Sequence, residues 1–259
     1  MDLDKFYTRP EVAELCCSYI DFSKYDSVLE PSAGNGAFLP FLPNYTKAVD
    51  ISPDVPEILE QDFLTYTGTE KLVIGNPPFG RVSSLAIKFF NHSATFAEAI
   101  AFIIPRTFRR ISVQNKLDLN FHLVQDIELP VGSFFPATMQ AKCCFQVWER
   151  KDYKRTKVEL PMLHNDFKVM SYVTVAGSVQ APEGADFAIR AYGGNCGQIS
   201  LDIEDLAPKS WHFIKSDKAE EIIENFEQLD YYPLASWTAR QDSVGKGELI
   251  WLYTQKFGS

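Results

Sequence analysis

Short apolar runs alternate with amphipathic stretches from the N-terminus to about residue 150. The run at 99–104 is apolar throughout, whereas a strand with one face in water would alternate apolar and polar residues. Continuously apolar strands separated by helices predict a mainly parallel sheet that is covered on both faces. We expect strands at 27–30, 48–50, near 58–59, at 72–75, 99–104, 121–129 and 142–148, and helices at 10–19, 83–94 and 107–117.

The pattern changes after Arg150, where a charged connector at 151–157 is followed by more turns and fewer long apolar runs. Short strands are expected at 169–175 and 187–192 and a helix at 219–229. The sequence therefore predicts two domains. Residues 1–150 would form the larger α/β domain, and residues 151–259 a small α+β lobe for target recognition or substrate binding.

The chain carries 25 basic and 34 acidic residues, a formal net charge of −9 at pH 7. This charge argues against unspecific, salt-driven binding to nucleic acid. A nucleic-acid surface must then be a local patch, and the best candidate is Arg106, Arg109 and Arg110, supported by Lys88 and Lys116. A solvated helix face would explain this cluster equally well.

Cysteine and histidine usage excludes several classes of site. Four of the five cysteines form two adjacent pairs, and none has the C-x-x-C spacing of a zinc site. Their odd number does not suit a closed disulfide framework. The four histidines have no metal-ligand spacing, so we expect buried, reduced thiols and no metal. The sequence shows neither a signal-peptide pattern nor a run of roughly 20 apolar residues that could cross a bilayer. We therefore expect a soluble, intracellular protein, in the cytoplasm or nucleoid.

The first candidate for chemistry is a glycine turn that follows the strand at 27–30. Gly34 and Gly36 would let the backbone approach a bound nucleoside closely, at the carboxyl ends of the strands, and an apolar helix is expected to follow. Asp50 ends the next strand, where an acidic side chain can accept both hydroxyls of a ribose. Asp62 and Phe63 could bind an adenine amine and pack on its ring. Each signal is weak alone.

The strongest signal is Asn76-Pro77-Pro78-Phe79, directly after a buried strand. The two prolines stiffen the backbone and remove two amide donors. The Asn76 side-chain oxygen and the Pro77 carbonyl then form a pair of acceptors that suits an NH2 group, while Phe79 can stack on the ring bearing the amine. Such acceptors favour a tetrahedral nitrogen, which frees a delocalised lone pair for attack on a methyl group.

These residues together resemble the class I S-adenosylmethionine-dependent methyltransferases, specifically the adenine-N6 DNA methyltransferases of the gamma motif order with N-P-P-[YF]. The resemblance covers roughly residues 5–150. It implies a Rossmann-like, mainly parallel seven-stranded sheet with an antiparallel last strand, and S-adenosyl-L-methionine as cofactor. It also implies base flipping, with a target pocket walled by Phe79 and by Phe134 or Phe135.

The resemblance assigns roles to residues as follows. The catalytic residues are Asn76, Pro77, Pro78 and Phe79. The cofactor-binding residues are Phe6, Tyr7, Thr8, Glu30, Pro31, Ser32, Ala33, Gly34, Gly36, Asp50, Ile51, Asp62 and Phe63. The substrate-binding residues are Phe134, Phe135, Arg106, Arg109 and Arg110. Thr8 is also a candidate cap for the first helix, which Pro10 would begin.

Several alternatives remain open at this stage. DNA is the expected partner and RNA the second choice, and a homodimer or a partner subunit is compatible with either. A protein glutamine N5 methyltransferase would grip a side-chain amide with the same motif, although such enzymes usually carry a helical domain before the glycine loop. A catalytically inactive methyltransferase-like subunit that binds nucleic acid is the non-enzymatic alternative.

Overall fold

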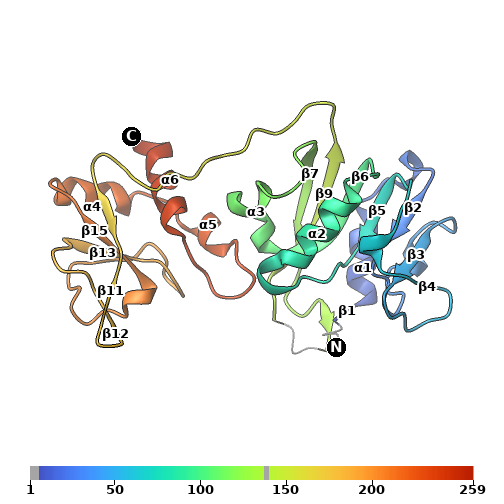
Figure 1. The fold of residues 1–259 in the computed structure, drawn as a ribbon, viewed down its shortest axis with the longest axis horizontal. Coiled ribbons are helices and arrows are strands. Elements are labelled where there is room, and N and C mark those ends of the chain that lie inside the picture. The colour runs from blue at the N-terminus through green and yellow to red at the C-terminus, as the bar shows by residue number, and fades with distance from the viewer. Residues whose placement is uncertain (1–5, 137–139, 259) are drawn as a thin grey trace. The chain divides into compact units, whose positions relative to one another are not determined.

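The computed structural model describes residues 6–136 and 140–258 of the chain. The chain divides into two compact units, Met1–Lys157 and Val158–Ser259. Figure 1 shows the strands and helices of both units, and each unit is described by itself.

The first unit is built on a seven-stranded sheet in the order β4-β3-β2-β5-β6-β9-β7. The five strands from β4 to β6 are parallel, and β9 runs antiparallel to both β6 and β7. The fold class expected from the sequence is therefore confirmed, including the antiparallel last strand. The strands are β2 (Val28–Glu30), β3 (Lys47–Asp50), β4 (Leu59–Glu60), β5 (Leu72–Gly75), β6 (Ala99–Pro105), β7 (Phe121–Glu128) and β9 (Cys143–Arg150).

The interior strand β6 shows that the sheet is covered on both faces. All seven of its residues are buried. Because side chains alternate across a strand, Phe102 and Ile104 enter one apolar cluster, while Ala101 and Ile103 enter the other. Helix α2 (Ser84–Ser93), which lies across one face of the sheet in Figure 1, contributes buried residues to the first cluster. Helix α1 (Pro10–Ser18) contributes to the second.

Two predicted helices of this unit are wrong. After the glycine turn, the chain forms only a single 3-10 turn, Leu39–Phe41, because Pro40 and Pro43 lack the amide hydrogens that a longer helix needs. The helix expected at 107–117 is divided into a 3-10 turn, Arg106–Arg109, and a short α3 (Ile111–Gln114). Arg110 separates them with an extended backbone at φ −69° and ψ 137°.

Thr8 does not cap α1. The N-cap residue is Arg9, and the described residues provide it with no side-chain capping bond. Thr8 instead belongs to the short strand β1 (Tyr7–Thr8), which pairs antiparallel with β8 (Phe134–Phe135).

The second unit has an antiparallel sheet in the order β10-β15-β13-β14 and a separate hairpin of β11 and β12. The stretch expected as one strand at 169–175 is two, because β10 and β11 lie in different sheets. Strand β15 and helix α6 were not expected. The elements are β10 (Lys168–Met170), β11 (Val173–Val175), β12 (Ser178–Gln180), β13 (Phe187–Arg190), β14 (Ile199–Ser200), β15 (Trp211–Lys215), α4 (Ala219–Glu227), α5 (Tyr232–Ser236) and α6 (Lys246–Phe257).

Within residues 6–136 and 140–258, no helix is both long and apolar enough to cross a membrane, and no three His, Cys, Asp or Glu side chains are grouped to hold a metal. All five cysteines are free thiols. Burial raises the pKa of the Cys17 and Cys143 thiols to about 12, which keeps both protonated and unreactive at neutral pH.

The interior strand β6 provides a stability test. Phe102 is 1% exposed, so Phe102→Ala should lower the free energy of unfolding by about 3–5 kcal/mol through lost burial and a residual cavity. Urea denaturation followed by circular dichroism measures the loss. Val124→Ala is the control, because Val124 is 43% exposed on the edge strand β7 and should change stability by less than about 1 kcal/mol. Equal losses in the two variants would contradict the burial of β6.

Candidate active site

The candidate site lies at the carboxyl ends of three neighbouring strands. Strand β2 pairs in parallel with β3 on one side and with β5 on the other. The glycine turn after β2, Asp50 at the end of β3 and Asn76 after β5 therefore meet at one edge of the sheet. Open α/β sheets bind ligands at this edge.

Backbone hydrogen bonds fix Asp50 beside the glycine turn. Its Oδ2 accepts from the Gly34 amide at 2.9 Å, and its Oδ1 accepts from the Ser52 amide at 2.8 Å. A carboxylate oxygen has two lone pairs, so each oxygen can accept a further hydrogen bond. Gly34 and Gly36 have φ values of 52° and 78°, the left-handed region that favours glycine.

Tyr7 lies against the glycine turn. A Cβ atom added to Gly34 would lie 3.4 Å from the Tyr7 ring, at van der Waals contact distance. The Tyr7 hydroxyl donates to Asp54 Oδ2 at 2.5 Å, and the Asp54 amide donates to the Gly34 carbonyl at 2.9 Å. The structure thus brings Tyr7 and the glycine turn together. Both were assigned to cofactor binding from the sequence.

The other residues assigned to the cofactor differ in exposure. Ala33 is 4% exposed, Pro31 is buried and Phe6 packs partly buried on the apolar cluster of α1. Ile51, directly after Asp50, is 55% exposed and therefore offers an apolar surface at the site.

Glu30 is a buried carboxyl group at the end of β2. It is 1% exposed, and its Oε2 has no hydrogen-bond partner among the described residues. Burial, with a smaller contribution from the Asp50 charge, raises the pKa of Glu30 to about 8. A Cβ atom added to Gly75 would lie 3.2 Å from Glu30 Cγ, so the carboxyl group lies directly against the strand that leads to Asn76.

Asn76 is held by two hydroxyl groups. Ser32 Oγ donates to the Asn76 main-chain carbonyl at 3.0 Å, and Asn76 Nδ2 donates to Thr8 Oγ1 at 3.1 Å. In the described part of the chain, the buried Asn76 Oδ1 has no partner. A buried oxygen of this kind costs about 1–3 kcal/mol unless a ligand or water satisfies it.

Two segments carry the aromatic rings assigned to the target pocket. Phe79 packs edge-on against Phe134 with ring centroids 6.3 Å apart, and Phe134 is 1% exposed. Phe135 is 45% exposed, and the Arg9 guanidinium lies 3.9 Å from the centre of its ring. Of the two candidates for a second aromatic wall, only Phe135 has an exposed ring.

The assignment of Phe63 to the adenine pocket needs a correction. The Phe63 ring is 2% exposed and packs on Phe89 and His92 in the apolar core, so it offers no face to a ligand. The core takes the ring because Phe63 begins a 3-10 turn that faces α2. Asp62 is exposed and accepts from the Leu64 amide at 2.9 Å, which makes it the cap of that turn.

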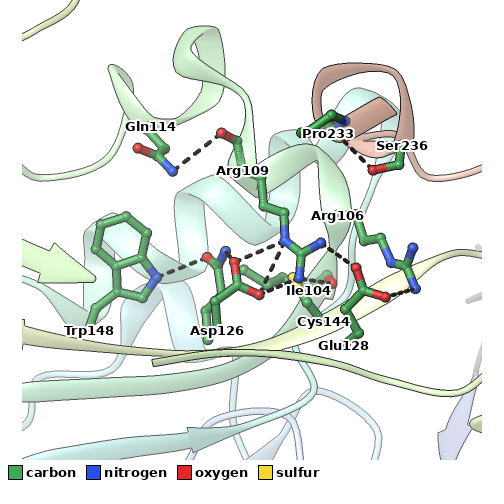
Figure 2. Close-up of polar contacts among 11 residues, drawn as sticks. Ile104, Arg106, Arg109, Gln114, Asp126, Glu128, Cys144, Trp148, Pro233 and Ser236 are labelled. Atoms are coloured by element: carbon green, nitrogen blue, oxygen red, sulfur yellow. Dashed lines mark hydrogen bonds and ion pairs between the residues drawn. The ribbon is translucent and has the colours of Figure 1, made fainter. Parts of the chain in front are cut away.

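Arg106 and Arg109 form ion pairs inside the first unit, as Figure 2 shows. Arg109 donates from Nε to Asp126 Oδ2 at 2.9 Å and from Nη1 to Glu128 Oε1 at 2.7 Å, and Arg106 Nη2 lies 3.0 Å from Glu128 Oε2. The hydrogen bond from Arg109 lowers the pKa of Glu128. Both guanidinium groups are therefore neutralised locally, and phosphate binding by Arg106, Arg109 or Arg110 stays a prediction.

The sequence reading missed the acidic partners of this network. Asp126 and Glu128 are two residues apart on β7, and this spacing places both side chains on one face of the strand. The network continues on the neighbouring strand, where Gln146 donates to Asp126 and accepts from the Trp148 indole. An i, i+2 pair of acids on a strand is the signal that could have identified them.

No family model matches the chain, and no curated protein matches it. Among solved structures, it is similar to a modification subunit of a putative type I restriction enzyme from Vibrio vulnificus YJ016, with 18% identity, a TM-score of 0.46, and coverage of 71% of this chain and 49% of that one. The 23S rRNA methyltransferase ErmE matches with 14% identity, a TM-score of 0.43, and coverage of 57% and 71%.

A dimethyladenosine transferase from Plasmodium falciparum matches with 15% identity and a TM-score of 0.42, over 56% of this chain and 63% of that one. The chain thus spans about half the length of the restriction-enzyme subunit. At these values the likeness assigns no reaction and no substrate to this chain.

Glu30 leads to a pH-dependent prediction. A carboxyl group whose pKa is raised by folding stabilises the fold fully below its ordinary pKa, and this contribution is lost as the pH rises toward about 8. Glu30→Gln should therefore gain stability over the wild type between about pH 5 and 8, by up to roughly 1.4 kcal/mol per pH unit. Urea unfolding across this range measures the gain, with the exposed Glu57→Gln as control. A gain that is independent of pH would contradict the assignment.

Proposed function

We propose that this chain transfers the methyl group of S-adenosyl-L-methionine to the N6 amine of adenine in a nucleic acid, with DNA as the expected substrate. The observation that carries the proposal is Asn76 Oδ1, a buried acceptor without a partner among the described residues, at the sheet edge that also holds Asp50 and the glycine turn. An unsatisfied acceptor at a ligand-binding edge is complementary to a donor on a ligand.

The residues present fit the cofactor. The unpartnered oxygen of Glu30 is complementary to the ammonium group of a methionine moiety, and the left-handed Gly34 and Gly36 allow close backbone approach. Asp50 would accept the ribose hydroxyls, while Ile51 and Asp62 would contact the adenine ring and its amine. When bound, the cofactor supplies an electrophilic methyl group.

Asn76 and the Pro77 carbonyl would hold the target amine through its two hydrogens. Each acceptor positions one N–H bond, which draws the nitrogen toward a tetrahedral geometry and directs its lone pair at the methyl group. Because Asn76 is held by Thr8 and Ser32 before a ligand arrives, its oxygen needs little reorganisation during the reaction.

Phe79 and Phe135 would form the walls of the target pocket. A base stacked in a duplex presents neither its faces nor its amine to such a pocket, so the target adenine would be flipped out of the helix. DNA is preferred over RNA because of the order of the motifs along the chain and the lobe that follows them. That lobe, the unit Val158–Ser259, is proposed to contribute to target recognition.

Methyl transfer can be tested directly with labelled cofactor. The protein is incubated with separate pools of DNA, RNA and protein, and the products are digested and analysed by mass spectrometry. We expect N6-methyladenine in the DNA pool. Label only in RNA would change the substrate, and label on glutamine would change the reaction class. Absence of both cofactor binding and transfer would overturn the proposal.

Two substitutions should separate catalysis from cofactor binding. Asn76→Ala should reduce kcat by roughly 100-fold or more because it removes an acceptor placed for the transition state, while the cofactor Kd changes by less than about threefold. Asp50→Ala should instead weaken cofactor binding by about 10- to 100-fold, since it removes charge-assisted hydrogen bonds. Calorimetry and single-turnover kinetics distinguish the two. Equal losses of both quantities in Asn76→Ala would assign Asn76 to folding.

A further inference from the structure

We infer that Thr8 is a positioning residue that sets the orientation of the Asn76 amide, an inference that rests on the proposed function for its catalytic consequence. Thr8 is 5% exposed, and its Oγ1 accepts a hydrogen bond from Asn76 Nδ2 at 3.1 Å. The contact joins residues 68 positions apart in the sequence.

The orientation of this amide decides what the site can bind. A rotation of 180° about the last side-chain bond exchanges the oxygen and the NH2 group, and only the oxygen can accept from an amine. Because Nδ2 donates to Thr8, Oδ1 is the end left without a partner in the described structure. Ser32 fixes the same residue through its main-chain carbonyl. Thr8 and Ser32 together hold the side chain and the backbone of Asn76.

Thr8 is itself held on both sides. In the β1–β8 pair, Thr8 lies opposite Phe134. The next residue, Arg9, donates from its amide to the Ser133 carbonyl at 3.0 Å and from Nε to the Gly132 carbonyl at 2.6 Å. The strand that carries the Thr8 hydroxyl is therefore tied to the segment that carries the proposed aromatic wall. The geometry couples the orientation of Asn76 to the placement of that segment.

This role differs from the one that the family resemblance implies for Thr8, which is to help hold the cofactor. The two roles predict different kinetic effects. A residue that acts through Asn76 changes kcat and leaves the cofactor Kd unchanged, whereas a cofactor contact changes the Kd.

Thr8→Val tests the inference because valine keeps the branched shape of threonine and removes only its hydroxyl group. We expect kcat to fall about tenfold, the effect of losing one hydrogen bond, while the cofactor Kd stays within about twofold. Thr8→Ser should restore kcat to within about twofold of the wild type. Thr95→Val is the matched control, because the Thr95 hydroxyl makes an exposed local bond to the His92 carbonyl.

A thermal-unfolding cycle tests the contact without any assay of activity. Thr8→Val should lower the unfolding midpoint of the wild-type chain because it removes the hydrogen bond that Asn76 Nδ2 donates to Thr8. It should lower the midpoint less in the Asn76→Ala background, where this bond is already absent. Additive shifts of the midpoint would show that the contact is absent and would overturn the inference. The kinetic assay would also overturn it if the wild type is active and Thr8→Val keeps full kcat or loses only cofactor affinity. A wild type that methylates no pool would overturn the proposed function, and the cycle would still decide the contact.

Discussion

The parallel pairing of β2 with β3 and with β5 is the constraint on which the candidate site depends. Three segments that are far apart in sequence end at the same edge of the sheet because these strands run in one direction. Apolar clusters on both faces of the sheet stabilise this pairing, because side chains of β2 and β5 alternate between the two clusters. A rigid sheet therefore fixes the distance between the glycine turn and Asn76, which loops alone could not do.

The same sheet tolerates polar groups that a core normally excludes. Glu30 Oε2 and Asn76 Oδ1 are buried and lack partners within residues 6–136 and 140–258, and each such atom costs about 1–3 kcal/mol. Under the proposed function, the cofactor ammonium group would satisfy the first atom and the target amine the second. By contrast, Asp126 and Glu128 on β7 are satisfied by arginines of the same unit, which points to a structural role for that network.

The strand β1 links parts of the site that the sequence separates widely. Tyr7 contacts the glycine turn, Thr8 holds Asn76, and Arg9 stacks on Phe135. A two-residue strand has little stability of its own, so its place depends on pairing with β8 and on these side-chain contacts.

The sequence by itself determined the sheet and which segments end at the carboxyl edge of its parallel strands. A fully apolar run such as 99–104 is stable as a strand only where both faces of the sheet are covered. Gly34 and Gly36 have positive φ angles, which few other residues adopt. Only the tertiary structure decided which partner each side chain meets. Phe63 entered the core, Arg109 paired with Asp126, and Thr8 bound Asn76 rather than capping a helix. These outcomes depend on segments brought together by folding, whereas sequence patterns record only local burial and backbone freedom.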